Sequence, residues 1–505
     1  MGKISRLLLK MHNYSKNIEP ENDLSYRLAK GVIFAQKGST LYLIRKNPLA
    51  TITLNSIWKP VLDLMSQGEF IKFTEIYTYV NTDPDKTEKY LNSLVRKGFM
   101  ESWGYRSLSD YPFVTIIIPV RNRPDEISRC LASLSELDYP SDKKEIIVVD
   151  DASRDNTADV VSGFPVRLIK NSSRMHASHS RNLAAKEAKG DILAFIDSDC
   201  TADRLWLKGL VPAFNDEING VAGGKVDSWF DKKALDKYEK ISSSLNMGPR
   251  SKSSKEEGSF FYLPTCNLLV KKEIFLKLDG FKADMTVGED VDFCWRLKNM
   301  GYEIEYLPTG IVFHKHRNKT TAFFKRRFQY GTSEPFLREK HPDRIKQMYY
   351  MPLTMLLWLI VLIALLTGCY FLLGLCGIIL VIDTHAKWKQ AKEKELPIKY
   401  SQVLSAVLRG YFVSIYYWCA FFSRYYLVMA FIFFPVFPII CLILFINHII
   451  VSLCEFFLKK APSNIFSFVY FFSIDQLAYQ IGVWYGCFRY LTFNPVNPKI
   501  SRWIS

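Results

Sequence analysis

The sequence predicts an α/β protein in which a central domain with a mostly parallel sheet lies between a small α+β domain and a helical C-terminal region. Three observations predict this order. Strand-like and helix-like segments alternate over 113–345, short strands followed by three helices fill 26–104, and two apolar runs follow, at 350–382 and 427–458. Alternating strands and helices are typical of parallel sheets that helices cover on both faces.

Residues 26–104 have the element order of a winged-helix-like domain. Short alternating strands are predicted within 28–54, separated by turn residues. The last predicted helix begins at Asp83-Pro84, an N-cap followed by proline in the first turn. The predicted helices cover 55–67, 70–80 and 84–97.

The central domain contains five apolar segments that we interpret as strands: TIIIPV, EIIVVDD, VRLIK, DILAFID and GVAGGKV. Three of them end in polar residues. In open α/β sheets, ligands bind outside the carboxyl ends of the strands. The sequence therefore predicts a functional site at this edge of the sheet.

Residues 346–505 form the predicted membrane-associated region. Each apolar run is long for one span of about 20 residues and short for two, which favours paired short helices or re-entrant hairpins. Gly368 and the Asn447-His448 pair are the predicted hairpin tips, and Pro435 and Pro438 are expected to kink the second run. The aromatic stretches that follow each run, 401–426 and 464–491, are predicted to lie at the membrane interface.

The formal net charge is +16, and lysines and arginines crowd the segments beside the apolar runs. This distribution favours membrane lipids over nucleic acid as the partner, because basic connectors stay on the cytosolic face and attract anionic headgroups. The N-terminus lacks the features of a cleavable signal. We therefore expect a cytoplasmic-membrane protein with its catalytic domain on the cytosolic face. The ten cysteines are scattered without metal-ligand spacing, which fits a reducing compartment.

The segment ILAFIDSDC at 192–200 places Asp197 and Asp199 one residue apart at the end of a predicted buried strand. Two carboxylates in this position suit Mg²⁺ or Mn²⁺, which bind through one or two carboxylates plus substrate phosphates. An isolated Asp-x-Asp also occurs as a simple helix cap. Other motifs in the domain favour the metal.

Three further motifs accompany this one: TIIIPVRNR at 115–123, IIVVDDAS at 146–153 and GEDVDFCWRL at 288–297. With these four motifs, residues 113–330 resemble family 2 inverting glycosyltransferases, which have a Rossmann-like fold called GT-A. The Gln-x-x-Arg-Trp motif of processive synthases is missing after Asp290, where the chain reads FFKRRFQYG. The resemblance therefore implies a transferase and disfavours a polymer-extruding synthase.

The resemblance implies a nucleotide-sugar site in which each matching residue has a role. The nucleotide pocket would be shaped by Pro119, Val120 and Arg121, and the base and ribose would be received by Asp150 and Asp151. The diphosphate would be approached by Arg181 and joined to the metal by the loop with Asp197 and Ser198. Gly223-Gly224 and Thr265-Cys266-Asn267 lie where the family lines its donor and acceptor pockets.

The resemblance also implies the metal and the base. Asp199, with Asp197 and His314, would hold Mg²⁺ or Mn²⁺; the alternative for His314 and its neighbour His316 is an ordinary strand end. Asp290, beside Glu289, would take the proton from the acceptor hydroxyl, so that a single displacement inverts the anomeric centre. The alternative is that both acids simply begin a helix, where negative charge is favourable.

Residues 26–104 resemble the peptide-recognition domain of the pyrroloquinoline-quinone peptide chaperone. This resemblance implies binding of a precursor peptide as an extra strand at an open sheet edge. Two alternatives are a DNA-reading winged helix and a packing appendage. Acidic residues are interspersed among the basic residues of the last helix, which disfavours nucleic acid.

The whole architecture resembles the glycosyltransferases of mycofactocin biosynthesis. This implies transfer of glucose from UDP-glucose onto a peptide-derived redox cofactor, building a short β-linked glycan. The hydrophobic tail supports a second acceptor class, a polyprenyl-phosphate lipid or a cell-envelope glycan. A third interpretation is an inactive peptide-binding scaffold, which the presence of Asp199 and Asp290 disfavours.

Overall fold

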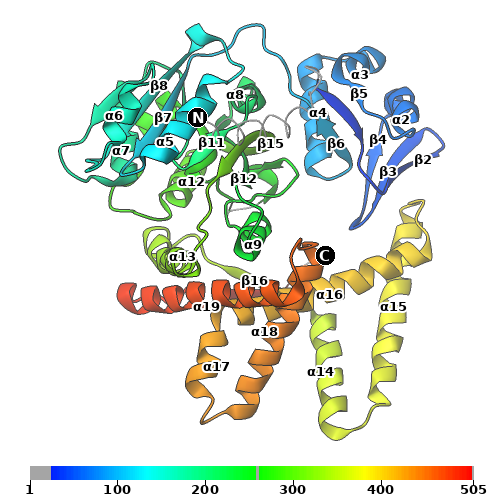
Figure 1. The fold of residues 1–505 in the computed structure, drawn as a ribbon. Helices are drawn as coiled ribbons and strands as arrows, with labels where there is room; N and C mark the ends of the chain where they lie inside the picture. Colours follow the sequence, from blue (N-terminus) through cyan, green and yellow to red (C-terminus); the bar gives the residue numbers. More distant parts are fainter. Residues whose placement is uncertain (1–23, 258–260, 503–505) are drawn as a thin grey trace.

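The computed structural model describes residues 24–257 and 261–502. An N-terminal α+β unit lies beside the central α/β domain, and both lie above a layer of long helices (Figure 1). Two helical hairpins extend from the opposite side of that layer.

The N-terminal unit contains two three-stranded antiparallel sheets, with strand orders β5-β1-β6 and β2-β3-β4. Asp83 caps α4 as predicted, because its Oδ1 accepts a hydrogen bond of 2.9 Å from the Lys86 N–H. The strands are β1 (Ser25–Leu28), β2 (Val32–Lys37), β3 (Thr40–Lys46), β4 (Leu49–Leu54), β5 (Ile71–Lys72) and β6 (Met100–Trp103), and the helices are η1 (Ser56–Trp58), α2 (Lys59–Met65), α3 (Phe73–Val80) and α4 (Pro84–Arg96).

The N-terminal unit contacts both other parts of the chain. Arg96 at the end of α4 forms an ion pair of 3.3 Å with Glu305 of the central domain, and both side chains are mostly buried. Leu49 at the start of β4 packs against Val403 and Val407 of a long C-terminal helix. These contacts fix the unit beside the central domain.

The central domain is built on a nine-stranded sheet. Eight strands follow the order β11-β15-β12-β14-β10-β7-β8-β9, and the ninth, β13, pairs with β15. All five predicted strands are present, as β7, β8, β9, β10 and β12. The strands are β7 (Val114–Val120), β8 (Lys144–Asp150), β9 (Arg167–Lys170), β10 (Ile192–Phe195), β11 (Cys200–Ala202), β12 (Asn219–Ser228), β13 (Lys252–Ser253), β14 (Leu268–Lys271) and β15 (Glu303–His314).

The prediction of a mostly parallel sheet was wrong for one half of it. Strands β9, β8, β7 and β10 are parallel, but β14 runs antiparallel to both β10 and β12, and β11 runs antiparallel to β15. The short segment LLVK of β14 was not recognised as a strand. Its insertion between β10 and β12 makes the sheet mixed.

Helices cover both faces of this sheet because successive side chains of its strands point to opposite sides. Ile116 and Ile118 of β7 belong to one buried cluster, and Ile117 belongs to the other. The helices are α5 (Pro124–Ser135), η2 (Ser141–Lys143), α6 (Thr157–Ser162), α7 (His176–Glu187), α8 (Trp206–Leu210), η3 (Val211–Asn215), α9 (Ala234–Ser242), α10 (Ser254–Glu257), η4 (Thr265–Asn267), α11 (Lys272–Lys277), α12 (Glu289–Asn299) and α13 (Thr320–Lys340).

The C-terminal region consists of two hairpins, α14–α15 and α17–α18, and two long helices, α16 and α19, that run across the molecule (Figure 1). By length and composition, α16 and α18 could each cross a membrane. The elements are β16 (Gln347–Tyr350), α14 (Pro352–Thr367), α15 (Leu372–Glu393), α16 (Tyr400–Tyr425), α17 (Leu427–Phe433), α18 (Pro438–Leu458), α19 (Ile465–Tyr490) and β17 (Lys499–Arg502), with β17 parallel to β16.

The tip of the first hairpin is correctly predicted, and the tip of the second is not. Gly368 ends α14 with φ +68, a left-handed conformation that favours glycine. Asn447 and His448 lie inside α18, and His448 is buried between Ser423 and Ser473. The second hairpin turns instead between Phe433 and Pro438, because Pro435 and Pro438 interrupt the helix.

Helix α13 of the central domain packs on α19 with very close backbones. A Cβ on Gly331 would lie 2.0 Å from the Tyr479 carbonyl oxygen, and a Cβ on Gly482 would lie 2.1 Å from the Phe328 carbonyl oxygen. Glycine is therefore required on both helices at this crossing. The crossing joins the central domain to the C-terminal region.

We predict that Gly331→Ala lowers the free energy of unfolding by about 1–3 kcal/mol, the usual cost of overpacking, because α13 and α19 must separate. Thermal unfolding of the detergent-solubilised protein measures this. Gly410→Ala in α16 is the matched control, since a Cβ there meets nothing within 4 Å. Equal melting temperatures for the two variants would contradict a tight contact between α13 and α19 at Gly331.

Candidate active site

A cavity of about 770 Å³ lies at the carboxyl ends of the central strands, as the sequence predicted. The cavity is lined by the ends of β7 and β15, the loop after β10, the start of α12, and part of α13. It contains almost all the predicted site residues: Pro119, Val120, Arg121, Asp151, Arg181, Asp197, Ser198, Asp199, Glu289, Asp290 and His314. Asp150 does not line it, and of the residues expected at the donor and acceptor pockets, Thr265 and Cys266 line the cavity but Gly223, Gly224 and Asn267 do not.

The two acids that follow β8 have different surroundings. Asp150 accepts hydrogen bonds from the backbone and side chain of Ser153 and does not line the cavity. Asp151 accepts from the backbone N–H groups of Met175 (2.6 Å) and His176 (3.0 Å) and from Asn171. Burial opposes ionisation of Asp151, but these hydrogen bonds outweigh it and lower its pKa. Of the two, only Asp151 lines the cavity.

Arg181 connects the two acidic motifs from its position on α7. Its guanidinium lies 2.5 Å from the Asp197 carboxylate and 3.2 Å from the Glu289 carboxylate, and the side chain is 4% exposed. A fork of donors is suited to holding two oxygen groups at once. Arg181 therefore fixes the strand-end motif at 197–199 against the start of α12.

Asp199 is the centre of a second charged group. Its carboxylate lies 2.6 Å from Arg123, 3.7 Å from His314 and 3.9 Å from Arg317. Burial opposes ionisation of Asp199, but these neighbours outweigh it and hold the pKa below the ordinary value. The carboxylate is therefore charged at neutral pH.

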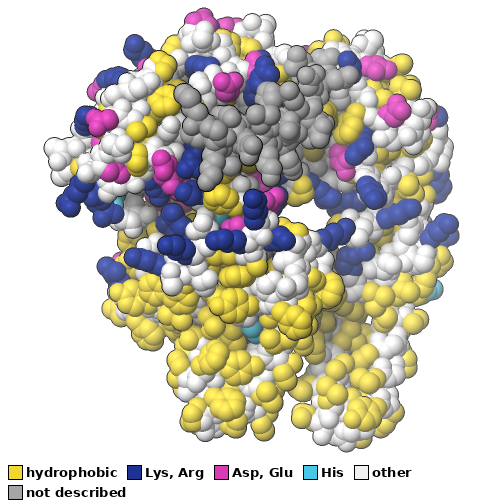
Figure 2. All heavy atoms as spheres, in the orientation of Figure 1, with side chains coloured by type: hydrophobic (Ala, Val, Ile, Leu, Met, Phe, Trp, Pro, Cys, Tyr) yellow, Lys and Arg dark blue, Asp and Glu magenta, His cyan; other side chains and the backbone are white. Residues whose placement is uncertain are grey.

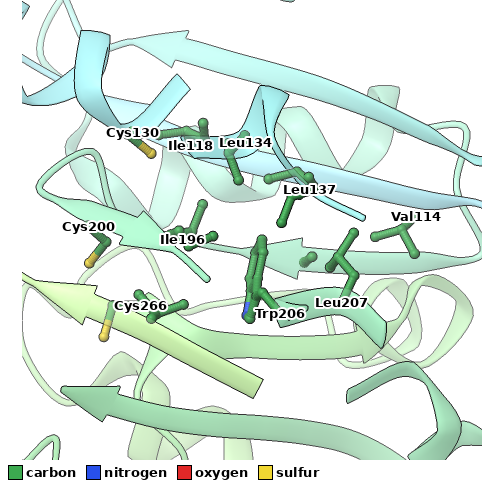
Figure 3. Packing of buried hydrophobic residues seen from close by; sticks show 14 of the residues in the cluster. Val114, Ile118, Cys130, Leu134, Leu137, Ile196, Cys200, Trp206, Leu207 and Cys266 are labelled. Atoms are coloured by element: carbon green, nitrogen blue, oxygen red, sulfur yellow. The ribbon is translucent and has the colours of Figure 1, made fainter. Parts of the chain in front are cut away.

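Asp199 and His314 fit a divalent cation by the chemistry of their donors. Burial lowers the pKa of His314, so the neutral ring can offer a lone pair beside the carboxylate. Cys200 lies in the same cluster, within 4.8 Å, but its side chain belongs to the apolar core with Ile196 and Trp206 (Figure 3). Burial raises the pKa of this thiol, which therefore stays protonated and is a poor ligand.

Asp290 is the carboxylate most suited to accept a proton. Burial raises its pKa to about 7, and the neighbouring Glu289 carboxylate adds to the shift. Its Oδ1 accepts a hydrogen bond of 2.8 Å from the Val291 N–H. A general base works best when its pKa lies near the working pH.

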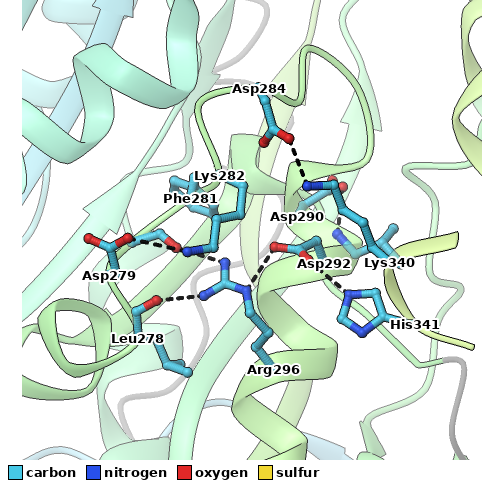
Figure 4. A network of polar contacts seen from close by, with 12 residues as sticks. Leu278, Asp279, Phe281, Lys282, Asp284, Asp290, Asp292, Arg296, Lys340 and His341 are labelled. Carbon is cyan, nitrogen blue, oxygen red and sulfur yellow. Dashed lines mark hydrogen bonds and ion pairs between the residues drawn. The ribbon is translucent and has the colours of Figure 1, made fainter. Parts of the chain in front are cut away.

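A polar network behind Asp290 holds the start of α12 in place (Figure 4). Asp292 accepts hydrogen bonds of 2.8 Å from both Arg296 and His341. Arg296 also donates to the carbonyl oxygens of Leu278 (2.6 Å) and Gly280 (2.7 Å). This network joins α12 to the preceding loop and to the end of α13, and so positions Glu289 and Asp290.

Three arginines and a tyrosine that the motifs did not predict also line the cavity. Arg123 belongs to the first motif, so its position two residues beyond Arg121 was the available signal. Arg326 on α13, and Arg424 and Tyr479 on α16 and α19, also line the cavity. No local motif marks these three, because tertiary packing alone places them there.

Residues 115–278 match the family described as Glycosyl transferase family 2. The central domain is therefore a family 2 glycosyltransferase domain.

Two relatives illustrate the extent of the similarity. The chain is 26% identical over 401 residues to the pre-mycofactocin glycosyltransferase of Mycobacterium tuberculosis. This alignment covers 77% of this chain and 82% of that protein. The chain is also 27% identical over 233 residues to the glycosyltransferase AglE of Haloferax volcanii. That alignment covers 45% of this chain and 74% of that protein.

Among solved structures, the mannosyltransferase PcManGT from Pyrobaculum calidifontis, in complex with GDP-Man and Mn²⁺, aligns with a TM-score of 0.38 and 21% identity. The alignment covers 61% of this chain and 86% of that chain.

We predict that Asp290→Asn lowers kcat by about 100-fold to 10,000-fold, the range that general-base catalysis contributes. The wild-type rate should rise with pH through about 7, because Asp290 must lose its proton to act. Initial rates between pH 5.5 and 8.5 measure both effects. Asp284→Asn is the control, since Asp284 is an exposed residue on the loop before α12.

The same substitution should stabilise the fold at alkaline pH. A folded-state pKa raised above the ordinary value of about 3.9 means that ionising Asp290 lowers stability as pH rises from about 4 to about 7. Asp290→Asn removes that charge, so its melting temperature should exceed the wild-type value at pH 8 and approach it at pH 4. Full turnover by the variant would contradict the assignment of the base.

Proposed function

We propose that this enzyme is a metal-dependent inverting glycosyltransferase that moves a sugar from a nucleoside-diphosphate donor to a hydroxyl of a peptide-derived acceptor. The observation that carries the proposal is that three groups line one cavity. They are the ionised carboxylate of Asp199, the neutral imidazole of His314 and the carboxyl group of Asp290, whose pKa is raised. An inverting transfer needs these two functions on opposite sides of the anomeric carbon.

The donor half of the site is assigned to the residues near β7, α7 and the loop after β10. Pro119, Val120 and Asp151 lie at the cavity wall where the nucleoside would bind. The Nε of Arg121 is buried and has no hydrogen-bond partner among the described residues, so it is available to an anionic ligand. Arg181 and Ser198 line the region assigned to the diphosphate.

Asp199 and His314 would hold Mg²⁺ or Mn²⁺, and Asp197 stays a further predicted ligand. When bound, the cation neutralises charge on the departing nucleoside diphosphate. Arg123 pairs with Asp199 at 2.6 Å and lines the cavity, so we assign it to exchange that carboxylate for a phosphate oxygen of the donor.

The acceptor hydroxyl would bind beside Asp290, which removes its proton as the new bond to the anomeric carbon forms. Glu289 is held by Arg181 and is therefore assigned to positioning rather than proton transfer. The bond to the donor diphosphate breaks in the same displacement, which inverts the configuration of the sugar.

Two observations support a peptide-derived acceptor. One is the similarity to the pre-mycofactocin glycosyltransferase of Mycobacterium tuberculosis over most of both chains. The other is β2, whose outer edge has no strand partner among the described residues. An open edge can bind an extended peptide through main-chain hydrogen bonds.

A different observation supports a second acceptor, a polyprenyl phosphate. The cavity extends to Arg424 and Tyr479, which belong to the helices that lie beside the apolar hairpins. Arg424 lies over the Tyr479 ring at 3.7 Å and carries a positive charge to that end of the cavity. A phosphate on a lipid chain would match this charge.

We predict that the purified chain, supplied with Mn²⁺, transfers a hexose from UDP-glucose to pre-mycofactocin in preference to polyprenyl phosphate. Mass spectrometry of both acceptors, with GDP-mannose as the alternative donor, measures this. Transfer to polyprenyl phosphate alone would show that the lipid phosphate, and not the peptide-derived compound, is the acceptor. Transfer to neither acceptor from any nucleotide sugar would contradict both.

We predict that Gln36→Pro weakens binding of a precursor peptide at least about tenfold, while leaving donor hydrolysis unchanged. Lys37 and Thr40 close the two-residue turn of the β2–β3 hairpin, so the alternating ladder directs the Gln36 N–H outward. Proline removes that donor. Gln36→Ala, which keeps the N–H, is the matched control, and fluorescence anisotropy of a labelled peptide is the measurement. Equal binding by the two variants would exclude this edge.

We predict that Asp199→Asn lowers the affinity for Mn²⁺ in the presence of UDP by at least about tenfold, because a charged oxygen ligand becomes a neutral one. The signal of free Mn²⁺ in electron paramagnetic resonance measures the affinity without turnover. Asp197→Asn, tested in parallel, separates a second ligand from a partner of Arg181. Unchanged Mn²⁺ affinity in Asp199→Asn would exclude this carboxylate as a ligand.

A further inference from the structure

The two apolar hairpins extend from one side of the molecule, away from the active site (Figures 1 and 2). We propose that both hairpins enter a single leaflet of an anionic phospholipid bilayer and that neither crosses it. The enzyme would then be a monotopic membrane protein whose hairpin tips end near the bilayer centre. This proposal concerns the mode of membrane binding and does not depend on the identity of the acceptor.

The composition of the hairpins requires a hydrocarbon environment. No Asp, Glu, Lys or Arg occurs in 351–382 or 427–454. The most exposed side chains at the tips are large and apolar, among them Leu366 at 77% and Phe371 at 78% on the first hairpin, and Val436 at 66% and Ile439 at 75% on the second. Apolar surfaces of this extent mark membrane or protein contact sites, and Figure 2 shows apolar side chains gathered on both hairpins.

The second hairpin projects only about half the depth of a bilayer. On one arm, the Val428 N–H donates to Gln480 of α19 at 2.6 Å; on the other, Asn447 donates to the Cys419 carbonyl of α16 at 2.9 Å. Beyond these anchors, the helical arms rise about 8 Å from Val428 to Phe433 and about 14 Å from Asn447 to Pro438, at about 1.5 Å per residue. A hydrocarbon core is about 30 Å thick.

The first hairpin projects to a similar depth. Leu357 on α14 and Leu380 on α15 pack with Val403 and Val407 of α16. Between these contacts and the tip at Gly368, the arms rise about 12–16 Å. The two hairpins therefore reach nearly the same level below the layer formed by α16 and α19.

Several backbone N–H groups in both tips are paired within the tip, which lowers the cost of placing the turns in a bilayer interior without water. In the first tip, the N–H groups of Tyr370 and Leu372 donate to the carbonyl oxygens of Gly368 and Cys369, at 2.9 and 3.1 Å. In the second, Val436 and Phe437 both donate to the Phe433 carbonyl, at 3.0 and 2.9 Å. Pro435 and Pro438 have no N–H to satisfy.

Basic residues surround the bases of the hairpins at the level where headgroups would lie. Figure 2 shows a row of lysine and arginine side chains directly above the apolar surface. Exposed lysines follow α15 and α18 in the chain or end these helices: Lys389, Lys394, Lys399, Lys459 and Lys460. Each basic residue near an anionic surface contributes about 1 kcal/mol to binding.

Helices α16 and α18 do not cross the bilayer in this arrangement, although both are long enough. The second half of α18 packs between α16 and α19, where His448 accepts or donates hydrogen bonds of 2.8 and 2.9 Å to Ser423 and Ser473. Helix α16 carries Arg409 and Arg424 along its length and runs across the bases of the hairpins. Only the first half of α18 is left to enter the lipid.

Thiol labelling from each side of a membrane tests this proposal on the full chain. Native Cys369 reports on the first tip, Val436→Cys on the second, and Lys460→Cys on the base of the second hairpin. An impermeant maleimide is applied to intact bacterial cells expressing the chain and to inverted vesicles prepared from them. Peptide mass spectrometry then identifies which cysteine is modified, so that the other native cysteines can remain.

We expect the introduced thiol of the Lys460→Cys variant to react in inverted vesicles only. Native Cys369 and the introduced thiol of the Val436→Cys variant should react from neither side until detergent is added. Labelling of a tip in intact cells would show that its hairpin crosses the bilayer and would overturn the proposal. Labelling of a tip in inverted vesicles would show that its hairpin lies outside the lipid and would overturn it equally.

Discussion

The crossing of α13 and α19 is the contact on which the arrangement of the whole enzyme depends. Helix α13 lines the catalytic cavity on one side and rests on α19 on the other, with glycines on both helices at the closest approach. Beside this crossing, Arg327 of α13 forms ion pairs with Glu239 of α9 at 2.9 Å and Asp475 of α19 at 3.3 Å. Tyr238 adds a hydrogen bond of 2.9 Å to Asp475.

Buried charges of this kind add little net stability, because desolvation opposes the attraction between them. Their effect is on position: a shift of either helix would leave a buried charge without its partner. The glycine contacts set the distance between α13 and α19, and the Arg327 network opposes sliding along the contact. The catalytic cavity is thereby held at a fixed height above the apolar hairpins, and part of its wall is formed by α16 and α19.

The parts of the fold that the sequence predicted are those with local signals. Strand β7 and the cap of α4 follow from apolar runs and from the Asp83-Pro84 pair, and Gly368 follows from its position between two apolar helices. The strand β14 was not predicted because its three apolar residues, Leu268, Leu269 and Val270, are too few to show a period. Asn447 and His448 are polar residues in an apolar run, which suggested a tip; tertiary hydrogen bonds from α16 and α19 satisfy them inside α18 instead.

For the site, the motifs predicted which side chains meet at the cavity but not how they pair. Glu289 lies 108 positions after Arg181, and only the folded chain shows that one guanidinium joins it to Asp197. Arg326 and Arg424 were not predicted because their helices reach the cavity through tertiary packing. The order of motifs therefore indicated the chemistry, whereas the electrostatics required the structure.

The pairing of charges also explains why the acidic residues of the cavity differ in their surroundings before a ligand binds. Arg181 pairs with both Asp197 and Glu289, and Arg123 pairs with Asp199, so each of these three carboxylates faces a guanidinium. Asp290 forms no ion pair among the described residues, and its neighbour Glu289 repels a second negative charge. The carboxyl group without a cation is thus the one whose pKa rises to about 7. In the mechanism that we propose, a donor diphosphate with its cation exchanges partners with the paired groups, and Asp290 takes the proton.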